Sequence, residues 1–181
     1  ITTTLNAFKL SAEEADQVAD AMFTTVKLGK TTFEQLSATL SQAAPLAAAT
    51  GFSYQELLAA VASLTKQGVP TSQAMTQIRA AVQSVGKVLG DDVAKSMTLQ
   101  NAFQALADKA GGSQNKLTEM VGSVEAVGAV LSLTGVNAAG AAKDLEDLGD
   151  SAGAADKAFK SMAGSNQNEW AILGNKIKAP T

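Results

Sequence analysis

The chain has 181 residues, of which 46% are hydrophobic, 4% aromatic and 17% charged, and its formal net charge is −3. It contains neither histidine nor cysteine, which excludes Ser-His-Asp and Cys-His catalysis, the usual zinc sites and disulfide bonds. Its basic residues form no cluster and include a single arginine, Arg79, so we expect no specific binding of nucleic acid. We also expect no cofactor.

The first part of the chain predicts one helix after a short lead-in. Residues 2–10 form the lead-in, with Phe8 and Leu10 as its apolar residues. Residues 11–14 read Ser-Ala-Glu-Glu, a capping box, and an apolar pattern at spacings of three and four continues to Leu28. We expect Gly29 to end this helix.

The stretch from Thr32 to Val82 predicts three amphipathic helices. The first covers residues 33–50, with Thr32 as N-cap and Gln35 three residues on, and the second covers 54–67, opened by a Ser53–Glu56 capping box. The third begins at Thr71 or Ser72. Gly51 and the pair Gly68–Pro70 separate these helices, because glycine adopts the left-handed closing conformation and proline favours a helix start.

The second half predicts further short helices. They cover residues 91–97, 98–110, 113–121, 123–133, 141–148, 154–162 and 168–177, with a break at 135–140. No stretch alternates as a half-buried strand does. We therefore expect an all-α fold, a multi-helix bundle of short helices separated by glycine and proline breaks. It forms a single helical region over 1–181, with helical hairpins at about 11–84 and a second helical half at about 91–178.

One sequence pattern occurs twice. The residues Glu-x-x-x-Ala-Val-x-Ser-Leu-Thr at 56–65 recur at 125–134 without a gap. Both copies are predicted to be helices that open near a serine and are followed by glycine. A diverged duplication of one helical hairpin explains the pattern, and so does chance in an alanine-rich chain.

The acidic residues do not predict catalysis. Candidate carboxylate groups are Glu13–Glu14, Asp91–Asp92 and the run Asp144, Glu146, Asp147 and Asp150. The first two lie at helix starts, where a carboxylate complements the helix dipole, and the run is interpreted as solvated and close to Lys143. No phosphate-binding glycine motif is present. We expect no catalytic residues and no metal site.

Two uncharged runs, 35–55 and 126–142, have the length of a membrane span. Polar residues and a proline interrupt the first and glycines the second, so neither is the continuous apolar stretch that a span requires. The last predicted helix carries Trp170, Ile172, Leu173 and Ile177. These four are our candidates for contact with a partner, because tryptophan is favoured at contact centres; an ordinary core role is the alternative.

Several motifs together resemble the core of phage tail tape measure proteins. In the central stretch they are Ala44–Pro45, Gly51–Ser53, Leu57–Leu64, Gly68–Ala74 and Ile78–Arg79. In the second half they are Ala107–Gly112, Gly122–Ala126, Leu131–Gly135 and Ser151–Ala154. The resemblance covers residues from about 8 to 162. Met75 departs from it, since the family commonly has a glycine there.

The resemblance implies a structural component of a phage or prophage-derived tail. Tape measure proteins set tail length inside the tail tube and assist DNA delivery on infection, so the chain is expected to be a segment of a longer protein, located in the virion tail (tube lumen or tip) and made in the host cytoplasm. The implied partners are further copies of itself, as a trimer or hexamer, and tube, tail-tip or baseplate proteins. The alternatives are a membrane-interacting ejection segment that contacts the host membrane and a cell-wall-degrading enzyme domain; for the latter the sequence supplies no residues.

Overall fold

The computed structural model describes residues 1–90, 93 and 96–158, and these residues form helices and no strands. The α-helices are α1 (Thr2–Phe8), α2 (Ala15–Leu28), α3 (Phe33–Thr39), α4 (Ala44–Thr50), α5 (Tyr54–Lys66), α6 (Thr71–Leu89), α7 (Leu99–Lys109), α8 (Gln114–Val121), α9 (Val124–Leu133) and α10 (Ala138–Gly149). Short 3-10 helices are η1 (Ala12–Glu14), η2 (Leu40–Gln42) and η4 (Gly135–Asn137). The expected all-α, multi-helix class is confirmed.

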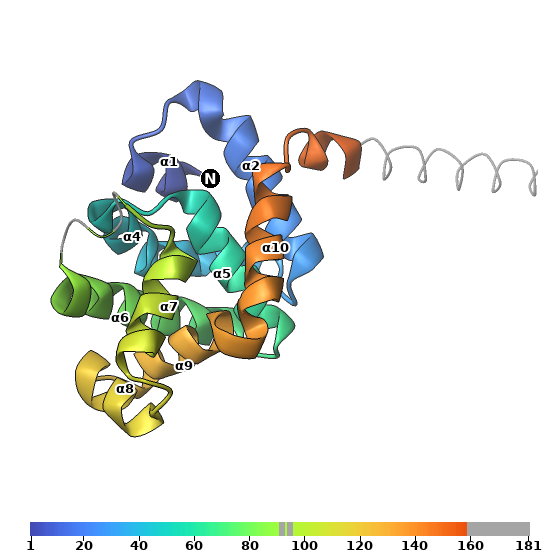
Figure 1. Ribbon diagram of the computed structural model, residues 1–181. Coiled ribbons are helices and arrows are strands. Elements are labelled where there is room, and N and C mark those ends of the chain that lie inside the picture. Colours follow the sequence, from blue (N-terminus) through green and yellow to red (C-terminus); the bar gives the residue numbers. More distant parts are fainter. Residues whose placement is uncertain (91–92, 94–95, 159–181) are drawn as a thin grey trace, which may run out of the picture.

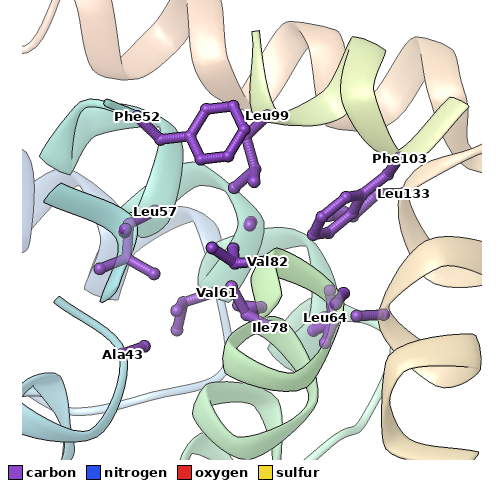
Figure 2. Packing of buried hydrophobic residues seen from close by; sticks show 14 of the residues in the cluster. Ala43, Phe52, Leu57, Val61, Leu64, Ile78, Val82, Leu99, Phe103 and Leu133 are labelled. Atoms are coloured by element: carbon purple, nitrogen blue, oxygen red, sulfur yellow. The ribbon is translucent and has the colours of Figure 1, made fainter. Parts of the chain in front are cut away.

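Helix α5 lies in the middle of the bundle, and the other helices surround it (Figure 1). Every residue from Leu57 to Thr65 is buried. Helices α2, α6 and α10 pack on α5, and α9 packs mainly on α6 and also contacts α5. The core joins side chains from helices that are distant in sequence (Figure 2): Leu57, Val61 and Leu64 of α5, Ile78 and Val82 of α6, Phe103 of α7 and Leu133 of α9.

Serine and threonine side chains fix the starts of five helices. In each case the hydroxyl oxygen accepts a hydrogen bond from the backbone N–H three residues later, which satisfies one of the otherwise unpaired amides of the first turn. The five capping residues are Thr32, Ser53, Thr98, Ser113 and Ser123. Local sequence therefore sets where these helices begin.

Three expectations about element boundaries are wrong. Residues 33–50 form α3, η2 and α4 instead of one helix, because Pro45 has no N–H to donate to the carbonyl four residues earlier. The lead-in contains a helix, α1, whose Phe8 ring packs edge-on against Tyr54 with centroids 6.0 Å apart. The break at 135–140 is shorter than expected, since α10 begins at Ala138.

The remaining expected helices lie wholly or partly outside the described residues. Only the start of the 154–162 helix is described, as helical backbone at 154–158. The 168–177 helix and most of the 91–97 segment lie outside the described residues.

Two of the predicted glycine breaks have the expected backbone conformation. Gly51 follows α4 with a φ of 91° and Gly68 follows α5 with a φ of 96°, both in the left-handed region that glycine tolerates.

Gly29 ends α2 for a different reason. Its φ and ψ are −90° and −176°, extended values that any residue adopts. A Cβ at this position would lie 2.4 Å from the Thr65 side-chain oxygen, 3.0 Å from the Thr25 carbonyl oxygen and 3.1 Å from the Ala62 Cα. The glycine is therefore needed for the close approach of the end of α2 to α5.

We predict that Gly29→Ala destabilises the fold by about 1–3 kcal/mol, since two of the atoms that the new methyl group meets are backbone. The measurement is chemical denaturation followed by circular dichroism. The control is Gly140→Ala inside α10, where a Cβ meets nothing within 4 Å; this change should stabilise by about 0.5–1 kcal/mol. Equal effects of the two variants would contradict the close-approach explanation.

Candidate functional site

The sequence-predicted contact residues Trp170, Ile172, Leu173 and Ile177 lie outside the described residues, so their role stays a prediction. The same holds for Asp91 and Asp92. Glu14 lies where a capping residue is expected, since its Oε2 accepts the Ser11 N–H at 2.8 Å.

The interpretation of Asp144 as a solvated residue is wrong. Its side chain is 3% exposed and lies between α10 and α5. The Ser63 hydroxyl donates to Oδ2 at 2.6 Å, and the half-exposed Lys66 ammonium pairs with Oδ1. By contrast, Glu146 and Asp147 do lie at the surface, where they pair with Lys143 at 3.8 and 2.9 Å.

The Asp144–Ser63–Lys66 cluster is suited to holding helices together and not to catalysis. Ser63 is 3% exposed, so no substrate reaches its hydroxyl. Both carboxylate oxygens are already occupied by donors from α5. A buried carboxylate needs such donors, because an unpaired charge in an apolar interface costs several kcal/mol. The cluster therefore ties α10 to α5 at one register.

Two further carboxylates connect segments that are distant in sequence. Glu56 accepts the Ser53 N–H with Oε2 at 2.7 Å and the Leu99 N–H with Oε1 at 2.9 Å, so it caps the starts of both α5 and α7. Asp20 of α2 accepts the backbone N–H groups of Gly153 and Ala155 at 2.6 and 2.8 Å. These contacts place a negative charge at helix starts, where the helix dipole favours it.

Among the described residues, three ionisable groups have clearly shifted pKa values. Burial raises the pKa of Tyr54, and the nearby Glu14 and Asp20 carboxylates add to the effect. A hydrogen bond from the Ser123 hydroxyl, 2.7 Å long, lowers the pKa of the exposed Glu125. A hydrogen bond to Asp147, with the charges of Asp147 and Glu146, raises the pKa of Lys143. The Glu125 carboxylate and the Lys143 ammonium therefore stay charged at neutral pH.

The hollows that the described residues form are open at the surface. Two of them have volumes of about 630 and 610 Å³: one lies between α1 and α4, the other between α2, α10 and residues 151–158. Among the described residues, no group of three or more histidine, cysteine or acidic side chains is placed to hold a metal ion.

Among the described residues, three large apolar side chains that are exposed lie on or next to α9 and in η4. Val124 is 75% exposed, Leu131 44% and Val136 99%. In the described part of the chain no single helix is long and apolar enough to cross a bilayer. Val124–Leu133 and Gly135–Gly149, bent by 46° relative to each other, satisfy that test only as a pair, by length and composition.

The family comparison identifies the kind of protein. Residues 1–97 match the model of the family described as phage-related minor tail protein. The chain belongs to this family. The match extends over α1 to α6 and thus contains Asp20, Glu56, Ser63 and Lys66. The chain is accordingly a component of a phage tail. The resemblance to phage tail proteins that its sequence motifs indicated is confirmed.

A probable tape measure protein of Clostridium phage phiCD119 is 32% identical to this minor tail protein over 83 residues. The aligned region makes up 46% of this chain but 9% of the phage protein, so the chain corresponds to a small part of that relative. No solved structure matched the chain.

We predict that Asp144→Ala lowers the free energy of unfolding by about 1–3 kcal/mol, because the buried Ser63 hydroxyl loses its acceptor and a void remains. The matched control on the same helix is Glu146→Ala, whose side chain is 71% exposed; its effect should stay below about 0.5 kcal/mol. Urea denaturation distinguishes the two. Similar losses from both variants would mean that the buried cluster does not tie α10 to α5.

We also predict that Tyr54, the only tyrosine in the sequence, has a pKa above the ordinary tyrosine value in the folded chain. Above the ordinary pKa the unfolded chain releases the phenol proton while the folded chain retains it. The free energy of unfolding should therefore fall as pH rises from about 10 to the folded-state pKa. Ultraviolet absorbance titration measures the pKa, and Glu14→Gln should lower it. A native pKa equal to that in denaturant would refute the burial of this group.

Proposed function

We propose that this chain is a compact segment of a tape measure protein that acts in tail assembly within the tail tube and assists DNA delivery on infection. The observation that carries the proposal is the similarity to a probable tape measure protein, within a family of minor tail proteins. The proposed location is the tube lumen or the tail tip, after synthesis in the host cytoplasm. The proposed role is structural and not enzymatic.

The fold supports a docking role for this segment over that of a length-setting rod. A rod requires a long continuous helix, which rises 1.5 Å per residue. In the described residues the longest helix, α6, has 19 residues, and the chain folds back repeatedly around α5. We propose that the segment behaves as one folded unit that docks on tail-tip, baseplate or tube proteins and on further copies of itself, in a trimer or hexamer.

The experiment compares two changes in the phage or prophage that carries the gene. The first deletes residues 32–82 in frame. The second is Leu64→Asp, which places a charge at a fully buried core position without changing the chain length. If the folded segment docks, we expect both changes to give failed tails, or tails of unchanged length that do not infect. Electron microscopy and plaque formation are the measurements.

An extended segment would give a different pair of results. The deletion would shorten the tails by about 75 Å, at 1.5 Å per residue, while Leu64→Asp would leave both tail length and infection unchanged. Infectious tails of normal length from the deletion would contradict any role in assembly or delivery. Circular dichroism of the purified Leu64→Asp chain verifies that the substitution unfolds the segment.

A second proposed function is contact with the host membrane during ejection. One observation favours this function. Together, α9 and the helical residues that follow it to Gly149 have the length and composition of a bent membrane span. The buried Asp144 lies within this stretch and would have to leave its partners on insertion. Flotation of the chain with phosphatidylglycerol vesicles tests the proposal, and absence of binding at both neutral and acidic pH would refute it.

A further inference from the structure

Helix α4 lies between α1 and α6 at one side of the bundle, and an open hollow lies on each side of it (Figure 1). The hollow towards α1 has a volume of about 630 Å³. The hollow towards α6, which η2 also lines, has a volume of about 440 Å³. Pro45 lines both hollows, so they adjoin. Six exposed residues that line them form what we call the α4 surface: Lys9, Gln42, Pro45, Ala49, Arg79 and Gln83.

The charged side chains that line these two hollows are both cationic. Lys9 lines the hollow towards α1, and Arg79 lines the hollow towards α6. Other hollows of the described residues differ, since Asp147 and Asp150 line the one between α2 and α10, and three aspartates line its neighbour. In a chain with 17 acidic and 14 basic residues, the α4 surface is therefore a place where positive charge is exposed without negative charge.

No acidic residue of the described chain pairs with these two cations. Neither Lys9 nor Arg79 takes part in an ion pair or a side-chain hydrogen bond within the described residues. Glu14, five residues after Lys9, accepts the Ser11 N–H instead. Glu34, the acid nearest in sequence to Gln42, lies in the first turn of α3, where it complements the helix dipole. Both cations are thus available to an acceptor from outside the chain.

The backbone at Lys9 gives a second reason to assign a role to its side chain. Lys9 follows α1 with a φ of 55° and a ψ of 37°, in the left-handed region. Every other described residue with a positive φ is a glycine. Because a Cβ disfavours this conformation, glycine would end α1 with less strain than lysine does. Residues in such conformations concentrate at functional sites, and here the residue places an ammonium group beside the hollow.

We propose that an acidic segment of another tail protein binds across the α4 surface, with one carboxylate at Arg79 and a second at Lys9. The inference rests on the proposed function, because it names the kind of partner on which the folded segment docks. A guanidinium group presents two parallel N–H donors that match a carboxylate. The amides of Gln42 and Gln83, which line the same hollow, supply further donors. Pro45 and Ala49 form the uncharged part of the surface between the two cations.

Charge favours this occupant over three others. DNA is bound through many phosphate contacts, whereas the α4 surface has two cations in a chain of net charge −3. A bilayer surface likewise requires a cluster of basic residues with aromatic side chains beside them. Two copies of this chain repel each other through their net charge, and the α4 surface contains no acid with which to pair with itself.

The test reverses the charge of single residues in the phage or prophage that carries the gene. Arg79→Glu and Lys9→Glu each place a carboxylate opposite an acid of the partner, so plaque formation should fall at least about tenfold. The matched control is Lys116→Glu in α8, which makes the same change in net charge at an exposed position that lines neither hollow. It should leave plaque formation unchanged. Circular dichroism of the purified chains verifies that all three variants retain the helical fold.

Suppressor selection then identifies the partner. Phage that regain plaque formation in the Arg79→Glu background should carry a lysine or arginine in place of an aspartate or glutamate of another tail protein. Normal plaque formation by Arg79→Glu, an equal loss from Lys116→Glu, or suppressors that exchange no acid of another protein would overturn the proposal. Suppressors confined to the acidic residues of this chain would assign the surface to a second copy.

Lys9→Gly separates binding from folding. Because glycine relieves the strain at this position, the melting temperature of the purified chain should not fall, while plaque formation should. Normal plaque formation would remove Lys9 from the site. Calorimetric titration of the purified chain with inorganic phosphate and with duplex DNA covers the remaining occupants. Binding of either that Arg79→Glu abolishes would assign the surface to phosphate groups and overturn the proposal.

The outcome is distinguishable from that of the tail experiment. If deletion of residues 32–82 prevents assembly or infection and Arg79→Glu has no effect, the assembly role stands and the α4 surface is refuted. If the deletion gives infectious tails of normal length, the assembly role itself is refuted.

Discussion

The close packing of small residues around α5 is the constraint on which the rest of the structure depends. Alanine and serine side chains on this helix allow the backbones of α2 and α10 to approach it, and Gly29 lies so close that a single methyl group there would meet backbone atoms. Few aromatic residues are available to fill space between helices. The bundle is therefore held together by many short-range contacts, which tolerate little change in volume.

Carboxylates that accept hydrogen bonds from a second segment add specificity to this packing. Apolar contacts between alanine-faced helices define register weakly, because one small side chain replaces another with little change in energy. Asp144, Glu56 and Asp20 each accept hydrogen bonds from a second segment, and each is satisfied at one relative position of the two segments only. Their cost in desolvation is offset by the donors that they meet, and the result is a defined arrangement of α2, α5, α7 and α10.

Membership of the family and the helical-bundle fold together support the proposed function. The chain belongs to a family of phage minor tail proteins, and its described residues fold into a bundle of short helices. A fold of this kind offers surfaces and not a length scale, which is why docking is proposed for it.

The sequence by itself determined the helical class, the starts of most helices and the absence of histidine and cysteine chemistry, because N-caps and apolar periodicity act over a few residues. The tertiary structure decided the rest. Asp144 looked like one acid in a solvated run, but Ala141 and Leu148 at helical spacing place it on the buried face of α10; that spacing was the signal available. Residues 2–8 became a helix through contacts with distant segments, such as Phe8 with Tyr54. Which face of α5 is covered and which face of α9 is open depends on helices far away in the chain, and local patterns contain no information about that.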